Sequence, residues 1–207
     1  MKYSKLLILI IFILLVDQCL KIYIKTHFYY GQEVALLGSW FRLHFIENEG
    51  MAFGMKFGDA SIAKLVLTLF RLVAVGFGFY YLNVMVKKGF KNATLICAAL
   101  ILAGAFGNLI DSIFYGKLFS ESGFCLAQWV PWGKGYANLF YGRVVDMLYF
   151  PLIEWTLPSS TPFIGAYTIR FFEPVFNIAD ASISIGVLTL LFFQKRLLTL
   201  PKEVKTD

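Results

Sequence analysis

The sequence is short of charged residues, and this scarcity excludes an ordinary soluble protein. Charged side chains make up 15% of its 207 residues and hydrophobic ones 58%, whereas about a quarter of the residues of a soluble domain are charged. A chain of this length forms one domain, or two at most. One such core cannot bury so much apolar surface, so lipid must cover part of it. We therefore expect a single integral membrane domain over residues 1–207.

Metal ligands are scarce as well. The two histidines stand apart, and the odd number and the spacing of the three cysteines give neither a disulfide framework nor a metal-binding pattern. We expect no metal and no cofactor. The net charge of +6 is compatible with nucleic-acid binding, but the basic residues flank apolar runs and form no stripe among stacking aromatics. No nucleic-acid partner is expected.

Four apolar runs approach the ~20 residues that a membrane-spanning helix needs. They cover residues 6–24, 62–85, 93–114 and 176–193, with the longer segments 25–60 and 115–175 between the first and last pairs. Basic residues are dense in the N-terminal stretch, in the short turn at 86–92 and in the C-terminal tail. Because cytoplasmic segments carry the excess of Lys and Arg, we expect both termini in the cytoplasm and both long segments outside.

The first run also has the shape of a signal peptide, because Lys2 and Lys5 precede it. Polar residues interrupt it at Asp17, Gln18 and Lys21, however, and no small-x-small cleavage site follows. We therefore expect an uncleaved span.

The two outer segments differ in character. Residues Glu33–Phe45 are β-rich and partly alternate, which predicts a hairpin. Segment 115–175 is rich in Trp, Tyr and Phe, and Trp and Tyr favour the headgroup level. We expect this segment to lie on the membrane surface. The predicted fold class is thus an all-α membrane protein of four spans with a small extracytoplasmic β-cradle and a surface segment.

Carboxylates and amides gather at one depth of these spans. Asp17 lies in the outer half of the first span, Asn108 and Asp111 end the third, and Asn177 and Asp180 begin the fourth. Lipid cannot solvate such groups, so they should point into the helix bundle and mark a functional site. The inner half of the spans has no comparable cluster. A site at one face is therefore favoured over a pathway through the membrane.

Structural roles compete with the functional ones. Asp17 and Lys21, an i, i+4 pair, suit an ion pair within the bundle. Asn108 and Asp111 suit a bridge between helices. Asp180 suits an acid at a helix N-terminus. Asp146, in the outer segment, suits a solvated loop. Composition and spacing leave these alternatives open, as they leave open a small transporter subunit or a non-catalytic scaffold.

Five short motifs nevertheless resemble, in order, the signature blocks of the lipoprotein signal peptidase (signal peptidase II) family. They are Asp17-Gln18-x-x-Lys21, Asn48-Glu49-Gly50-Met51-Ala52-Phe53-Gly54, Gly107-Asn108-Leu109-Ile110-Asp111, Val144-Val145-Asp146 and Phe176-Asn177-Ile178-Ala179-Asp180. Each block alone is weak, but together they run from end to end of the chain.

The resemblance implies a protease of the bacterial cytoplasmic (inner) membrane whose site faces the periplasm. It would cut the signal peptide from a lipid-modified prolipoprotein before the modified cysteine, and it would be a target of the cyclic peptide globomycin. The catalytic pair would be Asp146 and Asp180. The substrate-binding or supporting residues would be Asp17, Lys21, Asn48, Gly50, Asn108, Asp111 and Asn177. A monomer is the simplest expectation.

Two departures from the family pattern stand out. In many members an arginine that can reach a substrate carbonyl follows the acid of the third block, whereas Ser112 follows Asp111 here. Arg143 is one candidate to replace it. The aromatic stretch at about 117–141 is long for the family and suggests a restriction on which substrates enter. Neither departure touches the aspartates, which can share one proton because two adjacent carboxylates do not both ionise cheaply.

Overall fold

The computed structural model describes residues 1–38, 40–49, 60–151, 153–157, 168–171 and 174–197. Its helices are α1 (Tyr3–His27), α2 (Ala60–Lys87), α3 (Asn92–Ile110), the π-helix η2 (Asp111–Tyr115), α4 (Gly116–Leu118), α5 (Ile178–Phe192) and α6 (Gln194–Leu197). Its strands are β1 (Glu33–Leu37), β2 (Phe41–Asn48), β3 (Val144–Tyr149), β4 (Ile153–Thr156), β5 (Thr168–Phe171) and β6 (Val175–Phe176).

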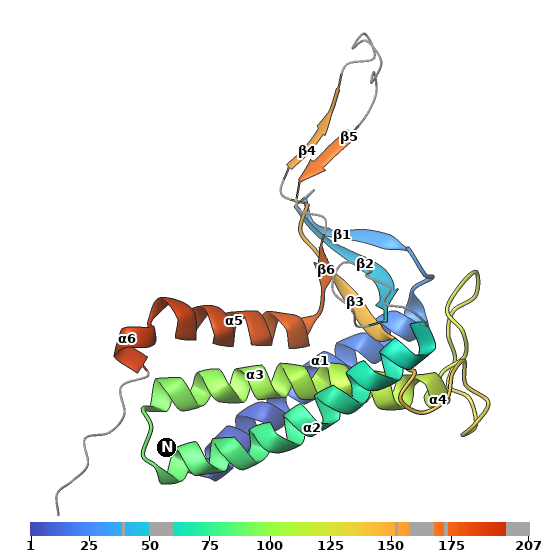
Figure 1. Cartoon of the computed structure of the whole chain (residues 1–207). Helices are drawn as coiled ribbons and strands as arrows, with labels where there is room; N and C mark the ends of the chain where they lie inside the picture. Colours follow the sequence, from blue (N-terminus) through green and yellow to red (C-terminus); the bar gives the residue numbers. More distant parts are fainter. Residues whose placement is uncertain (39, 50–59, 152, 158–167, 172–173, 198–207) are drawn as a thin grey trace, which may run out of the picture.

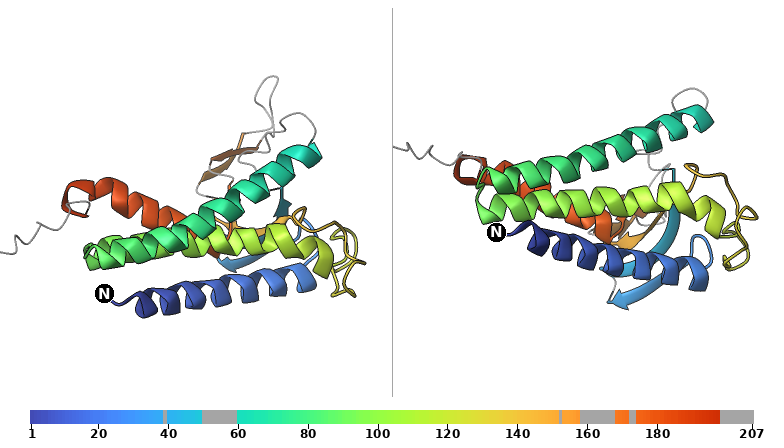
Figure 2. Two further views of the ribbon diagram at one scale, coloured as in Figure 1. Left: turned by 60° about the horizontal axis from the view of Figure 1, so that its bottom comes forward. Right: turned by 90° about the horizontal axis from the view of Figure 1, so that it is seen from below.

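The long helices run side by side, and the sheet sits at one end of them (Figure 1). Figure 2 shows α1, α2 and α3 neighbouring one another from two further directions. Within the described ranges, three helices are long and apolar enough to cross a membrane, those at Tyr3–His27, Ser61–Lys87 and Asn92–Leu118. Three of the four predicted spans are thus matched by helices of spanning length.

The fourth predicted span is shorter than expected. Helix α5 has 15 residues and begins at Ile178, whereas the sequence predicted a helix from residue 176. Phe176 instead ends strand β6, and Asn177 caps α5 by accepting a hydrogen bond from the backbone N–H of Asp180 at 2.8 Å. At ~1.5 Å per residue, α5 alone is about 22 Å long, below the ~30 Å of a bilayer core.

The β-structure is more extensive than the sequence predicted. The hairpin expected at Glu33–Phe45 is confirmed as β1 and β2, but these strands belong to an antiparallel sheet with the order β1-β2-β3-β6. A second sheet, β4 with β5, extends away from the helices (Figure 1). The description all-α is therefore wrong in its strict sense, although the chain is mostly helical. Strands β3 and β6 went unpredicted because segment 115–175 was interpreted from its aromatic content alone.

Helix α1 shows how one stripe of side chains can change character along its length. Leu6 and Ile10 are buried in an apolar core with residues of α2 and α3. The same stripe continues three and four residues at a time to Asp17, Lys21 and Ile24, which are also buried. The helix therefore anchors the bundle with its first half and places three charged groups, Asp17, Lys21 and Lys25, in the interior with its second half.

Helices α3 and α5 approach each other closely because small residues line their contact. A Cβ atom on Gly104 would lie 2.1 Å from the carbonyl oxygen of Ala179, and one on Gly186 would lie 2.7 Å from that of Cys97. Ser182 donates a hydrogen bond across the same contact to the carbonyl oxygen of Leu100 at 2.8 Å. Small residues and interhelical hydrogen bonds are the usual means of close packing in membranes. This packing sets the position of the first turn of α5.

The π-helix η2 lies at the end of α3 nearest the sheet. The carbonyl oxygen of Ser112 accepts a hydrogen bond from Gly142 at 2.9 Å, and that of Ile113 accepts one from Phe140 at 3.2 Å. A Cβ atom on Gly142 would lie 2.1 Å from the carbonyl oxygen of Asp111, so only glycine fits there. The irregular turn thus anchors the aromatic loop between Phe119 and Arg143 to the end of the bundle.

The opposite end of the molecule collects the N-terminus, the α2–α3 turn and α6 (Figure 1). The amino group of Met1 donates to Asn92 at 2.7 Å, and the Thr94 hydroxyl donates to the carbonyl oxygen of Leu197 at 2.7 Å. These are the segments in which basic residues are dense, so the predicted alternation of basic and less basic segments corresponds to the two ends of the helices. Which end faces the cytoplasm stays a prediction from charge.

Candidate functional site

Strand pairing carries one predicted catalytic residue toward the other. In the sheet, Leu148 pairs with Phe176 and Tyr149 with Val175, so the next step along the two strands sets Asn177 opposite Met147, the residue after Asp146. The amide nitrogen of Asn177 donates to Oδ1 of Asp146 at 2.6 Å and to Oδ1 of Asn108 at 3.2 Å. Asn108 in turn donates to Oδ1 of Asp180 at 2.7 Å. Two asparagine side chains therefore bridge the two aspartates.

A buried lysine lies beneath this bridge. The ammonium group of Lys21 is 3.0 Å from Oδ2 of Asp17, 2.8 Å from Oδ2 of Asp111 and 2.8 Å from Oδ1 of Asn108. Its side chain is 0% exposed, as is that of Asp111. Lys21 balances two buried carboxylates and fixes the carbonyl oxygen of Asn108, which leaves the amide nitrogen of Asn108 facing Asp180.

Asp17 connects the same cluster to helix α5. Its Oδ1 accepts a hydrogen bond from the backbone N–H of Ala179 at 2.9 Å. The first N–H groups of a helix have no partner within the helix, and an acid there is favoured by the helix dipole. Asp17 and Asn177 thus satisfy two successive N–H groups at the start of α5 and hold the turn that carries Asp180.

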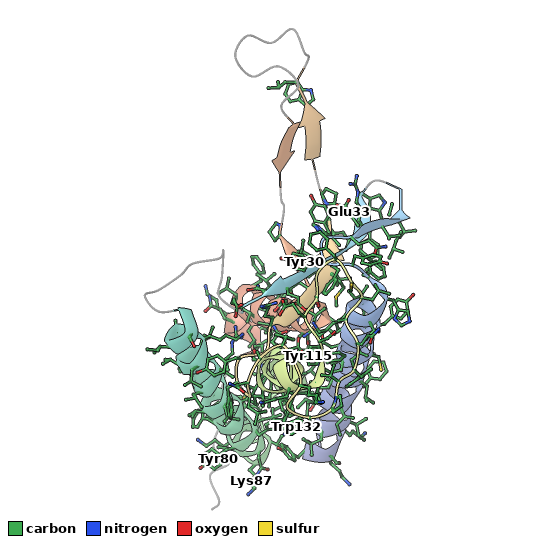
Figure 3. All side chains as sticks on the ribbon, turned by 90° about the vertical axis from the view of Figure 1, so that its right-hand side faces the viewer. Tyr30, Glu33, Tyr80, Lys87, Tyr115 and Trp132 are labelled. Carbon is green, nitrogen blue, oxygen red and sulfur yellow. The ribbon has the colours of Figure 1, made fainter. Side chains whose placement is uncertain are left out.

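Gln18 belongs to the cluster as well, although the sequence did not single it out as a site residue. Its amide nitrogen donates to Oδ1 of Asp111 at 2.9 Å, to the Gly107 carbonyl oxygen at 3.2 Å and to Oδ2 of Asp17 at 3.2 Å. The Tyr115 hydroxyl donates to its carbonyl oxygen at 3.1 Å. Figure 3, viewed from the sheet end, shows Tyr115 near the centre of the bundle, between α1 and α2. The position of Gln18 beside Asp17 was the available signal.

The structural alternatives can now be compared with the geometry. Asp17 and Lys21 form the expected ion pair, and Asn108 and Asp111 bridge helices as expected, but all four belong to one cluster that also contacts Asp180. Asp146 is on strand β3 and 2% exposed, so it is not a solvated loop residue. The predicted structural contacts of these residues therefore form one network around the predicted catalytic pair.

The environment of Asp146 favours its protonated form. Burial of the carboxyl and, next, the negative charge of Asp180 raise the pKa of Asp146 from 3.8 to about 7, against the opposing effects of Lys21, Asn48 and Asn177. A carboxyl that titrates near neutral pH beside a second carboxylate is a common feature of acid–base sites.

This pKa predicts a pH-dependent stability. Because the folded protein binds the proton on Asp146 more tightly than the unfolded chain, stabilisation is complete below pH 3.8 and is lost as the pH rises through about 7. Asp146→Asn cannot ionise, so at pH 8 we expect its free energy of unfolding to exceed that of the wild type by up to about 4 kcal/mol. Its thermal midpoint should be higher accordingly. The difference should narrow as the pH falls toward 4. Thermal unfolding in detergent measures it.

Glu33→Gln is a suitable control for that comparison, because Glu33 is an acid near the surface of β1, paired with Arg42 at 2.6 Å. It should show no such pH-dependent difference from the wild type. A difference between Asp146→Asn and wild type that is the same at every pH from 4 to 8 would contradict the assignment.

The remaining predicted site residues have distinct positions. Asn48, at the end of β2, donates to Oδ2 of Asp146 at 3.3 Å. Gly50 lies outside the described residues. Arg143 contacts Glu47 at 3.1 Å, Glu49 at 3.3 Å and also Glu121, so the described ion pairs engage it with glutamates instead of the aspartate pair. The structure gives no support to Arg143 as the replacement for the missing arginine.

Ser112, which follows Asp111 where the resemblance led us to expect an arginine, is 0% exposed. Its hydroxyl donates to the carbonyl oxygen of Asn108 at 2.9 Å, and Gly142 of the aromatic loop packs on the same turn. A long side chain has no room at this position unless the loop moves away.

Helix α2 adds polar residues that the sequence analysis missed. Lys64 donates to the Glu49 carbonyl oxygen at 2.7 Å, and Thr68 donates to the Phe140 carbonyl oxygen at 3.1 Å. Arg71 follows on the same face, at i+7 from Lys64. Ionisable residues within a predicted span deserve the same functional interpretation as Asp17 received. Their i, i+4, i+7 spacing was a signal available in the sequence.

A cavity of about 600 Å³ lies between α2, α3 and α5 and reaches this polar face. Its walls are mainly apolar, with side chains such as Val75, Leu82, Ile101, Leu102, Ile183 and Leu190. Arg71, Asn108 and Asp180 line it at the end toward the sheet, and Met85 lines it near the other end of α2. The distance from Arg71 to Met85 along a helix is about 21 Å at ~1.5 Å per residue.

The fold and the site define a class: a multi-pass membrane protein with a buried network of acids and amides at one end of an apolar cavity. A family profile described as Signal peptidase (SPase) II matches residues 9–195. The chain belongs to the signal peptidase II family, a family of bacterial membrane proteases, which confirms the resemblance predicted from its motifs.

Named relatives agree with this assignment. The lipoprotein signal peptidase of Porphyromonas gingivalis is 50% identical over 193 residues, which are 93% of this chain and 83% of that protein. The lipoprotein signal peptidase of Amoebophilus asiaticus is 38% identical over 184 residues, 87% of this chain and 73% of that protein.

Two solved structures of bacterial membrane enzymes share the fold. One has a TM-score of 0.57 at 22% identity and covers 98% of this chain and 96% of that chain. The other has a TM-score of 0.57 at 21% identity and covers 94% of each chain. At this level of identity the likeness concerns the fold alone.

Proposed function

We propose that this protein is an aspartic endopeptidase that removes the signal peptide from lipid-modified prolipoproteins, with Asp146 and Asp180 as the catalytic pair. The observation that carries the proposal is the pair itself, bridged by Asn177 and Asn108, with Asp180 on the wall of an apolar cavity. Family membership supports the substrate class, since relatives are named lipoprotein signal peptidases.

The proposed reaction needs one proton on the pair. Asp146 holds it, because its pKa is raised to about 7 by burial and by the charge of Asp180. Asp180, as the carboxylate, takes a proton from water while the water oxygen attacks the scissile carbonyl carbon, and Asp146 donates its proton to the carbonyl oxygen. The tetrahedral product then collapses: the proton on Asp180 passes to the leaving amine nitrogen, and a hydroxyl proton returns to Asp146. The two proton affinities belong to the pair as a unit.

The cavity suits the apolar part of a signal peptide. Its length of about 21 Å along α2 corresponds to about 14 helical residues, and the apolar region of signal peptides has roughly 7–15. Such a segment would remain in an apolar environment while only the scissile bond enters the polar end. The lipid-modified cysteine would stay close to the bilayer for the same reason.

The orientation follows from the charge rule applied to the two ends of the helices. The end with the N-terminus, the α2–α3 turn and α6 carries the dense basic residues and would face the cytoplasm. The aspartate pair would then lie at the outer, periplasmic boundary of the inner membrane, with α5 as a fourth, short span. The protein would act as a monomer, since the site combines α1, α3, β3 and α5 of one chain.

The test is cleavage of a synthetic diacylated prolipoprotein by the purified protein in detergent, with the product mass fixing the cut. We expect cleavage before the lipid-modified cysteine, blocked by globomycin, and no cleavage of the same precursor without the lipid. Well-folded protein that leaves the lipidated precursor intact, or that cuts at another bond, would refute the proposal.

A further inference from the structure

Arg71 is a charged residue at membrane depth that the proposed mechanism does not use. It lies on α2, is partly buried and lines the cavity together with Asp180 and Asn108. A guanidinium in a spanning helix is costly and is retained where it has a function.

The position of Arg71 on its helix separates it from the lipid. The stripe Lys64, Thr68 and Val75 is buried, and Arg71 lies on it, three residues after Thr68 and four before Val75. Val73, on another face, is 71% exposed and faces the lipid side. Figure 3 shows Tyr80 and Lys87 toward the far end of the same helix. Arg71 therefore stands where the polar part of the cavity ends and its apolar part begins.

Asn108 and Asp180 also line this end of the cavity and hydrogen-bond to each other. The amide nitrogen of Asn108 donates to Asp180, and its carbonyl oxygen accepts from Lys21 and Asn177. Asp180, as a carboxylate, only accepts hydrogen bonds. Arg71 lines the same end of the cavity, and its guanidinium presents five N–H donors in a planar fork, which suits a ligand that offers oxygen acceptors.

A signal peptide presents acceptors at this point. Its apolar helix must end before the scissile bond, because a peptide bond within a helix is shielded from the aspartates. The last four carbonyl groups of a helix have no partner within it, and leaving them unpaired away from water is costly. The C-terminal end of a helix also carries partial negative charge, which a cation stabilises.

We propose that Arg71 binds the free backbone carbonyl groups at the C-terminal end of the substrate's apolar helix and so positions the scissile bond at Asp146 and Asp180. The inference rests on the proposed function for the nature and the direction of the ligand. It also gives this chain an arginine contact to the substrate from α2.

Binding and cleavage must be measured separately. Binding uses a fluorescent diacylated precursor peptide and the cleavage-silent Asp146→Asn background, since Asp146 is not on the cavity wall. Adding Arg71→Met should raise Kd roughly 10- to 100-fold, the cost of losing hydrogen bonds to a charged group. Arg71→Lys keeps the charge but loses the fork, so its Kd should lie between that of Arg71→Met and that of the background with Arg71 intact. Lys87→Met, the loss of a basic residue at the far end of α2, should leave Kd unchanged.

In the active background, Arg71→Met should lower kcat/KM, and Arg71→Lys should recover part of the loss. Equal Kd for Arg71→Met and Lys87→Met would overturn the inference. So would unchanged binding with a shifted pH profile, because Arg71 would then act on Asp180. Should Arg71→Met fail to fold, Arg71→Gln carries the same test. Normal, Arg71-dependent binding by a wild type that does not cleave would refute the proposed function and leave only the binding of the peptide by Arg71 standing.

Discussion

Asp180→Asn is expected to lose cleavage of the lipid-modified precursor by roughly 10³-fold or more, since general acid–base groups contribute about 10²–10⁴-fold each and act as a unit. The amide cannot take a proton from water. The carbonyl oxygen of the new amide can still accept the hydrogen bond from Asn108, so the fold should persist. Asp146→Asn should fail to a similar extent because it cannot donate a proton to the carbonyl oxygen. Initial rates on the diacylated precursor measure both effects.

The double variant Asp146→Asn, Asp180→Asn separates a catalytic pair from two independent contributors. If the aspartates share one proton, the double variant should be about as inactive as either single one. Glu33→Gln serves as the matched control for a lost carboxylate and should cleave normally, because Glu33 lies on β1, paired with Arg42. Near-normal rates from either single variant, with intact folding, would rule out the pair.

Lys21→Met should destabilise the protein by about 3–5 kcal/mol, the usual cost of removing one partner from a buried ion pair. The change leaves Asp17 and Asp111 facing each other without a cation, and it removes a hydrogen-bond donor from Asn108. A loss of that size corresponds to a fall of roughly 10 °C or more in the thermal midpoint. Thermal unfolding in detergent at pH 7 measures it.

Lys5→Met is the control for Lys21, because Lys5 is exposed on the same helix. Its midpoint should match the wild type. Adding Asp111→Asn to Lys21→Met should recover part of the lost stability, since it removes one of the two uncompensated carboxylates. A Lys21→Met variant as stable as Lys5→Met would show that the cation does not hold the cluster together.

The sequence predicted the clustering of the polar residues better than it predicted the sheet. Asp17, Lys21, Asn108, Asp111 and Asn177 were chosen from polarity at one depth, and the structure brings them together. That inference works because lipid forces polar groups into the bundle. Strand β3 could not be placed in the same way, since Val144–Tyr149 pairs with residues far away in the chain. The β-branched and aromatic residues of β3 were a local indication of a strand. Nothing local identified the strands with which it pairs.

The sequence by itself determined that the protein is a membrane protein, where its long apolar helices lie to within a few residues, and which acids belong to one layer. Those properties follow from composition and from helical spacing, which are local. Tertiary structure decided that Asp146 meets Asp180 through two asparagines, that Ser112 is covered by the aromatic loop, and that Arg71 faces the same cavity as Asp180. Strand register and the close approach of α3 and α5 fix these contacts, and both depend on residues distant in sequence.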